Sequence, residues 1–408
     1  MPRTTTTTRR RAHIAMGGVP AVSHTLPSLE VIRELVARGH RVTYANDPRV
    51  ADLITPTGAE PVTYTSTLPV DDHDWPDDPI AAMDVFLDDG IQALPQLRAF
   101  YDRDPADLYL YDIGLLATRA LAESQGRPNL QLSPTYVAWD GYEEEVGAHL
   151  WSLPGADAFH AKYARWLAGS GAVTTDVDAF MGRPARGLAL IPRAMQPNAE
   201  RVDEARTTFV GPCFGPRADQ GGWTRPAGDA KVLLVSLGTA FTRRPEFYRQ
   251  CVAAFGGLPG WHVVLQIGRH TDPAELGDLP SNVEVHPWVP QLAILRQADA
   301  FVTHAGMGGS SEGLYAGVPM IAVPQAVDQF TNADRLVELG VARRLDTADA
   351  TADALRGALL ALTGDPEVAR RSAELRAAAR AEGGTARAAD LIEAMLPDGQ
   401  GGQGPARG

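Results

Sequence analysis

The sequence predicts an α/β protein with two Rossmann-like domains that face a central cleft. The 408 residues are too many for one ordinary hydrophobic core. Short apolar strands alternate with amphipathic helices in both halves, and a stretch rich in Gly and Pro at 211–230 separates the halves. The predicted boundaries are a disordered tail at 1–11, an N-terminal domain at 12–212, a linker at 213–230, a C-terminal domain at 231–397 and a disordered tail at 398–408.

The N-terminal half begins with a strand–helix–strand unit. An apolar strand at 13–16 leads into a loop at 17–27 that contains Gly and Pro. Ser28 can cap the amphipathic helix that follows, Gly39 can end it, and 41–45 forms the next strand. A βαβ unit of this kind implies a parallel sheet with right-handed crossovers.

Further strands are predicted along both halves. The strand at 108–111 ends at Asp112, and open α/β sheets bind their ligands at the carboxyl ends of strands. The elements predicted in the C-terminal half are strands at 231–236, 261–266, 283–286, 300–303 and 320–323 and a helix that starts near Asp353. Two such sheets would enclose a ligand between them.

Composition excludes several classes of protein. A formal net charge of −13 repels phosphate backbones, so we expect no nucleic-acid partner. The two cysteines, Cys213 and Cys251, cannot supply a disulfide framework, which fits a reducing compartment. No apolar run reaches the roughly 18 residues of a membrane helix, and no signal peptide is recognised. We therefore expect a cytoplasmic protein with no membrane insertion.

The middle of the C-terminal half contains a Gly-rich turn, His304–Glu312, that follows a strand and enters a helix near Gly309. The amino end of a helix offers unpaired N–H groups and a positive dipole end, which together can hold a phosphate. His304 and Ser310 would add side-chain donors. A turn of this kind can also be no more than a tight connection.

Glu312 of this segment and side chains of the two flanking segments are suited to the rest of a nucleotide sugar. Trp288 can stack on a base, although a lone Trp is often core. Glu312 would be repelled by phosphate and suits a ribose diol, or it has a helix-dipole or capping role. Asp328 and Gln329 suit sugar hydroxyls, although Asp328 can equally be a helix N-cap.

The ordered set of these residues within about forty positions resembles the donor signature of family 1, the UDP-dependent glycosyltransferases of the two-Rossmann (GT-B) fold. The resemblance implies that the C-terminal domain binds a UDP-sugar. Trp288 and Val289 would contact uracil, Gln291 and Glu312 the ribose, and 304–310 the diphosphate. The donor-binding residues so implied are Ser236, Gly238, Thr239, Trp288, Val289, Gln291, His304, Gly306, Gly308, Gly309, Ser310, Glu312, Asp328 and Gln329.

Transfer to an acceptor hydroxyl needs a base. His24 follows the first strand, and Asp112 ends another strand of the same sheet, so the two can meet and the carboxylate can orient the imidazole. His24 can also be a locally bonded loop residue, and Asp112 a helix cap.

The N-terminal half resembles the bacterial macrolide glycosyltransferases, the oleandomycin-glucosylating enzymes in particular. The similar segments are 29–44, 91–97, 141–146 and 196–199. In that family a His of a Gly-His-x-x-Pro segment is the base and an Asp pairs with it, and His24 and Asp112 occupy these places. The segment is altered here, because Ser23 replaces the Gly and Leu26 the Asn before Pro27.

The resemblance implies inverting transfer of a sugar, with glucose as the default, from a UDP-sugar to a hydroxyl of a lipophilic natural product such as a macrolide. Inactivation of an antibiotic or self-resistance would be the purpose, a homodimer is possible, and no cofactor or metal is implied. Two alternatives stay open: a catalytically weak partner protein that binds nucleotide sugars, and a UDP-sugar epimerase on the same fold.

The acceptor pocket is expected in the N-terminal domain. The candidate acceptor-binding residues are Trp75, Ser133, Tyr136, Trp139, Ala240 and Phe241. The spacing of Tyr136 and Trp139 is also compatible with one packed helix face. Phe86, Leu87 and Ile91 have helical spacing and are expected in the core.

Overall fold

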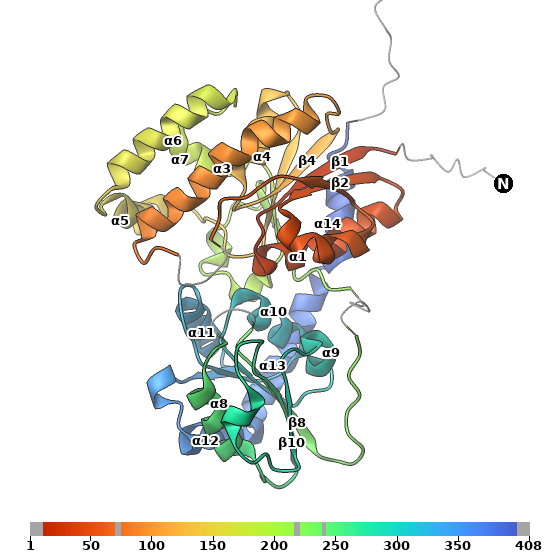
Figure 1. Cartoon of the computed structure of the whole chain (residues 1–408), viewed down its shortest axis with the longest axis vertical. Coiled ribbons are helices and arrows are strands. Elements are labelled where there is room, and N and C mark those ends of the chain that lie inside the picture. Colours follow the sequence, from red (N-terminus) through yellow and green to blue (C-terminus); the bar gives the residue numbers. More distant parts are fainter. Residues whose placement is uncertain (1–10, 70–74, 216–220, 239–241, 398–408) are drawn as a thin grey trace, which may run out of the picture.

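The computed structural model describes residues 11–69, 75–215, 221–238 and 242–397. Strands in these ranges form two sheets, one in each domain, and every strand pair is parallel (Figure 1). The N-terminal sheet has the order β3-β2-β1-β4-β5-β6-β7 and the C-terminal sheet the order β10-β9-β8-β11-β12-β13. The predicted fold of two Rossmann-like domains is therefore confirmed.

The strands of the N-terminal sheet are β1 (His13–Gly17), β2 (Arg41–Asn46), β3 (Glu60–Thr63), β4 (Leu108–Asp112), β5 (Asn129–Ser133), β6 (Gly187–Ala189) and β7 (Thr207–Phe209). The helices of this half are α1 (Val22–Ala37), α2 (Ala51–Ile54), α3 (Pro79–Tyr101), α4 (Leu116–Ser124), α5 (Ala148–Trp151), α6 (Ala156–Ser170) and α7 (Val177–Gly182). All five residues of β4 are buried, as expected of a central strand covered on both faces.

The strands of the C-terminal sheet are β8 (Lys231–Ser236), β9 (Trp261–Gln266), β10 (Val283–His286), β11 (Ala300–Thr303), β12 (Met320–Ala322) and β13 (Ala342–Arg344). The helices that follow or separate them are α8 (Pro245–Phe255), α9 (Gln291–Leu295), α10 (Met307–Ala316), α11 (Gln329–Glu338), α12 (Ala352–Gly364), α13 (Pro366–Ala381) and α14 (Gly384–Glu393). Four of the five predicted strands have the observed bounds, and β12 ends one residue early.

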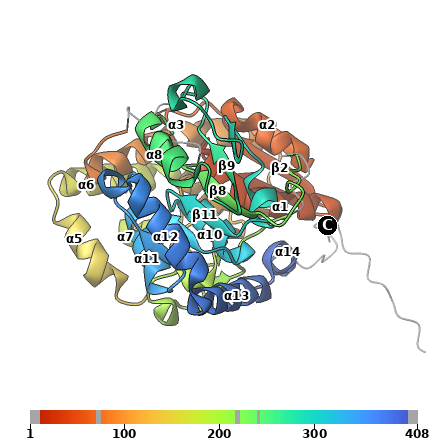
Figure 2. The same ribbon diagram turned by 90° about the horizontal axis from the view of Figure 1, so that it is seen from below.

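Helices cover both faces of the C-terminal sheet (Figure 2). Val232 and Leu234 of β8 belong to the core that includes side chains of α9, α10 and α11. Leu233 and Val235 belong to the core with α8 and α12. This alternation follows from the two-residue period of a strand. Residues that follow the carboxyl ends of β8, β11 and β12 line one cavity together with residues of the N-terminal domain.

The predicted start of the first helix is wrong. Helix α1 begins at Val22, so its first turn occupies residues expected to form a loop. Ser28 is buried within the helix, where its hydroxyl donates to the Thr25 carbonyl at 3.0 Å and lies 3.1 Å from the Tyr44 hydroxyl. A Ser in this position bonds back to its own helix instead of capping it. Pro27 lies inside the helix, in its second turn, and has no N–H to donate to the Ser23 carbonyl.

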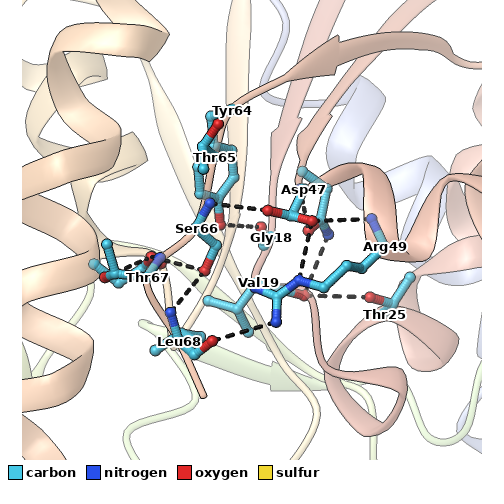
Figure 3. Close-up of polar contacts among 12 residues, drawn as sticks. Gly18, Val19, Thr25, Asp47, Arg49, Tyr64, Thr65, Ser66, Thr67 and Leu68 are labelled. Atoms are coloured by element: carbon cyan, nitrogen blue, oxygen red, sulfur yellow. Dashed lines mark hydrogen bonds and ion pairs between the residues drawn. The ribbon is translucent and has the colours of Figure 1, made fainter. Parts of the chain in front are cut away.

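The segment that enters α1 is fixed by side chains of neighbouring strands and loops (Figure 3). The Tyr64 hydroxyl donates to the Gly18 carbonyl at 3.0 Å, and the Thr25 hydroxyl donates to the Val19 carbonyl at 3.3 Å. The Asp47 carboxylate accepts from the backbone N–H of Ser66 at 2.9 Å. These contacts hold the first turn of α1, and with it His24, at the carboxyl edge of the sheet.

The last helix does not belong to the domain in which the sequence places it. Helix α14 lies beside α1 of the N-terminal domain (Figure 1). Its Ala388, Ala389 and Ile392 join the N-terminal core, and Glu393 contacts Nε2 of His40 at 2.9 Å. Helix α14 therefore packs with the N-terminal domain, although the predicted C-terminal domain at 231–397 includes it. Sequence position cannot reveal the crossing, because α14 has an ordinary amphipathic pattern.

The segment predicted as a linker, 213–230, contacts both domains. Its described parts, 213–215 and 221–230, contain no helix or strand. Cys213 is buried in the N-terminal core, whereas the Trp223 indole donates to Glu284 of β10 at 2.9 Å. Both cysteines of the chain are buried and free. None of the helices described here has the length and apolar character needed to cross a membrane.

Candidate active site

A cavity of about 760 Å³ lies between the two domains. Helices α1, α3, α4 and α6 line it from the N-terminal side, and the residues after β8, β11 and β12 line it from the C-terminal side. Its size is within the range of small-molecule sites. Chemistry in this cavity can use groups from both domains at once.

His24 and Asp112 meet at this cavity. His24 Nδ1 lies 2.9 Å from Asp112 Oδ1, and this oxygen also accepts from the Gly114 N–H at 2.7 Å. The Asp112 side chain is 2% exposed and lies behind the imidazole, which lines the cavity. A carboxylate acceptor fixes the proton on Nδ1, which leaves the lone pair of Nε2 as the basic site.

Electrostatics strengthen the imidazole as a base. Burial by itself lowers the pKa of His24, but the charge and hydrogen bond of Asp112, with a smaller contribution from the charge of Asp328, raise this pKa above its usual value. Asp328 lies in the C-terminal domain, so the two domains face each other across the cavity with a base on one side and a carboxylate on the other.

The predicted phosphate turn has the geometry of an anion site. Helix α10 begins at Met307, after Gly306, and no side chain caps it. The Nδ1 atom of His304 and the hydroxyl of Ser310 are buried, with no hydrogen-bond partner among the described residues. Unpaired donors at a helix amino end favour an anion. His304, Gly306, Gly308 and Gly309 line the cavity, and Ser310 lies just beneath it.

Burial lowers the pKa of His304 to about 4. The ring is therefore neutral at physiological pH and can donate a hydrogen bond but not neutralise charge. It is packed between two glycines: a Cβ on Gly238 would come within 2.6 Å of the ring, and one on Gly306 within 2.5 Å. Both positions require glycine because the imidazole occupies the space of a side chain.

The predicted base and ribose residues also line the cavity. Trp288 is 46% exposed there, which excludes ordinary core packing, and Val289 is buried beside it. The Gln291 amide donates to Glu312 Oε2 at 2.7 Å. Glu312 thus contacts Gln291 across the site instead of capping α10. Because the Gln291 nitrogen donates to Glu312, the carbonyl oxygen of the same amide can accept a hydrogen bond from a ligand hydroxyl.

Asp328 and Gln329 begin α11 at the cavity wall. Asp328 occupies the N-cap position, but its side chain makes no capping bond and accepts from the Asn332 amide at 3.0 Å. Gln329 Oε1 accepts from two backbone N–H groups, those of Gln325 and Ala326. The Gln329 amide nitrogen is therefore the group left to bind a ligand.

The predicted acceptor residues that the structure describes lie outside this cavity, and two of them, Tyr136 and Trp139, line a second, smaller cavity. Ser133 is buried and donates to the Thr135 carbonyl at 2.9 Å, and Trp75 packs against Phe86. The Tyr136 hydroxyl donates to Asn332 of the other domain at 2.7 Å. None of Trp75, Ser133, Tyr136 and Trp139 lines the large cavity, and the segment 134–139 is not a helix. Ala240 and Phe241 lie outside the described residues, as does Thr239 of the donor set.

Other side chains form the apolar wall that sequence reasoning missed. Phe86, expected in the core, lines the cavity from α3, and Leu87 lines it as well but is buried in the core as predicted. Phe159, Tyr163 and Trp166 line it from α6. Their spacing of four and three residues places them on one helix face, and this pattern in the sequence could have predicted an aromatic wall. Ser236 is fully buried below the site, where its hydroxyl accepts from the Gly238 N–H at 3.2 Å.

Comparison with known proteins finds relatives along most of the chain. Residues 189–375 match the family described as UDP-glucuronosyl and UDP-glucosyl transferase. The oleandomycin glycosyltransferase of Streptomyces antibioticus is 59% identical over 96% of this chain and 93% of its own length. The NDP-glycosyltransferase YjiC of Bacillus licheniformis is 37% identical over 94% of this chain and 98% of its own. The solved structure of the glycotransferase of kitacinnamycin is 55% identical and superposes with a TM-score of 0.87, over 95% of this chain and 100% of that one.

Proposed function

Because the chain belongs to the family of UDP-glucuronosyl and UDP-glucosyl transferases, we propose that this glycosyltransferase moves glucose from UDP-glucose to a hydroxyl group of a macrolide antibiotic. The observation that carries the proposal is the 2.9 Å contact of His24 with Asp112, opposite the uncapped start of α10. A base and an anion site facing one cavity are the two parts that group transfer from a diphosphate requires.

In the proposed reaction His24 Nε2 takes the proton of the acceptor hydroxyl as its oxygen attacks the anomeric carbon. The new carbon–oxygen bond forms on the face opposite the diphosphate, the bond to the diphosphate oxygen breaks, and UDP leaves. A single displacement inverts the configuration. Asp112 stabilises the imidazolium that forms.

The C-terminal domain supplies the donor site in this proposal. Trp288 stacks on uracil, while Gln291 and Glu312 bind the ribose hydroxyls. The N–H groups at the start of α10 and the neutral His304 donate to the diphosphate. We propose that these donors stabilise the leaving group without a metal ion.

Asp328 and the Gln329 amide nitrogen would hold hydroxyls of the transferred sugar, one as acceptor and the other as donor. The large apolar wall from α3 and α6 suits a lipophilic acceptor. A macrolide is the proposed acceptor because the 59% identical relative is an oleandomycin glycosyltransferase. Cytoplasmic inactivation of such an antibiotic would serve self-resistance.

The proposal is tested by UDP release and by mass spectrometry of the acceptor. We expect UDP release to require acceptor, and the acceptor to gain one hexose. His24→Ala should lose turnover by roughly 10²- to 10⁴-fold while UDP still binds, and His270→Ala, at an exposed position that lines neither cavity, serves as the control. Parental turnover in His24→Ala would exclude this base, and consumption of UDP-glucose without acceptor would favour an epimerase.

A further inference from the structure

A second cavity, of about 300 Å³, lies beside the first in the N-terminal domain. Three side chains line both cavities: Met83, Ile113 and Met181. All three are partly buried, and together they form the wall between the two spaces. Methionine side chains are flexible and repack easily, so a wall with two of them can open without movement of the backbone.

The second cavity has a different chemical character from the first. Trp139, Tyr142 and Trp151 give it aromatic surfaces, whereas Asp140, Glu143 and Asp178 add carboxylates. Asp203 also lines it, as do Arg206 and Arg183, which pairs with Glu143 at 3.3 Å. Four carboxylates against two guanidinium groups leave an excess of negative charge. Aromatic faces with carboxylate acceptors suit a ring that carries hydrogen-bond donors, either hydroxyl or ammonium groups.

We propose that the second cavity is an extension of the acceptor site, and that it binds a ring substituent of the acceptor that carries hydroxyl or amino groups. This inference rests on the proposed function, because it requires the acceptor to occupy the first cavity. The core of the acceptor would lie against α3 and α6, and its substituent would pass between Met83 and Met181. The second space therefore selects among acceptors that share one core.

Gly147 offers a way to fill the second cavity without disturbing the first. It is a buried residue of the second lining, and a Cβ built on it would have its nearest neighbours at 3.9 Å, ordinary contact distance. Its φ of −60° is open to any residue. Gly182 lines the same cavity with nothing within 4 Å of its Cβ position. Gly169, exposed on α6 and also open, is the matched surface control.

The experiment compares one macrolactone core in three forms: bare, with a neutral sugar substituent and with an amino-sugar substituent. Affinity is measured by calorimetry and kcat/KM by UDP release, for the parent protein and for Gly147→Phe, Gly182→Phe and Gly169→Phe. Either cavity-filling variant should lose roughly 10- to 100-fold for a substituted core and stay within about twofold for the bare core. Gly169→Phe should match the parent.

The two substituted cores distinguish the hydroxylated from the aminated ligand, and a loss for either one supports the extension. Equal affinities of the parent and both filling variants for all three cores would overturn it. Affinity also separates this inference from the proposed function. If no core is glycosylated but Gly147→Phe still weakens binding of a substituted core, the second site stands and the proposed reaction fails.

Discussion

The pairing of His24 with Asp112 makes the replacement Asp112→Asn the sharpest test of the catalytic geometry. Asparagine keeps the size and an oxygen acceptor for Nδ1–H but removes the charge 2.9 Å from the ring. Opposite charges this close shift a pKa by about 1–3 units. Without the charge the effect of burial prevails, and the pKa of His24 should fall below its usual value of about 6.5.

The magnitude follows from the same shift. One pKa unit corresponds to about 1.4 kcal/mol, so the imidazolium formed in the transition state loses about 1.4–4 kcal/mol of stabilisation. The plateau rate should therefore drop roughly 10- to 1000-fold. The base works only when deprotonated. The raised pKa makes the parent lose activity as pH falls through a value above about 6.5, and the acid limb of Asp112→Asn should lie about 1–3 pH units lower.

The assay is kcat/KM for UDP release between pH 5 and pH 9, with UDP affinity measured in parallel. Asp334→Asn, at an exposed position of α11 that pairs with Arg344, is the control. An unchanged acid limb, or a full plateau rate, in Asp112→Asn would refute the assignment. The free energy of unfolding gives a second readout. Because the pKa of His24 is raised in the folded state, the pair stabilises the fold below about pH 6.5. This stabilisation is lost as pH rises through the folded-state pKa.

Three further outcomes are expected. Val327→Gly should raise the free energy of unfolding by about 1 kcal/mol, because relief of a positive φ (about 1–3 kcal/mol) exceeds the entropic cost of glycine (about 0.5–1 kcal/mol); a lower melting temperature would contradict this. Asn332→Ala should raise the KM for UDP-glucose while UDP affinity stays constant, because Asp328 and Tyr136 lose a shared partner; weaker UDP binding in calorimetry would point to a structural role instead. Millimolar EDTA should leave the rate unchanged, and loss of activity that Mg²⁺ restores would show that a metal takes part.

Local sequence was sufficient where one strand or one turn determines the structure. The strand at 231–236 contains four consecutive apolar residues, which is typical of a buried parallel strand, and its bounds are as predicted. The Gly-rich segment after His304 was predictable for the same reason, because the glycines that let its backbone approach a ligand lie next to one another in the sequence. Helix α1 was misjudged because the hydroxyl of Ser28 can cap a helix or bond back to its own helix, and only its bond to the Thr25 carbonyl shows which one it does.

The acceptor wall could not be located in this way, because it depends on how distant helices pack. Tyr136 is predicted as an acceptor residue, but it lines the second cavity instead of the first, and its hydroxyl contacts Asn332, which lies 196 positions away. Phe86 resembles core, yet α3 is placed so that this ring faces the cavity. Both outcomes depend on the relative position of elements, and a helical period fixes only which residues share a face.

The loops after β11 and β12, which carry proposed donor-binding residues, each contain a residue with a strained, positive φ. Ala305, after β11, has φ of 61°, and Val327, after β12, has φ of 47°, a conformation that residues with a Cβ rarely adopt. Ala305 directly follows His304, and Val327 directly precedes Asp328. Both His304 and Asp328 are proposed to contact the donor. The Val327 side chain is 79% exposed, so packing does not compensate for its strain. Glycine would relieve that strain, but it would also free the backbone that holds Asp328 opposite His24. A side chain here thus restricts the unbound loop to the conformation that faces the base, at the expense of stability.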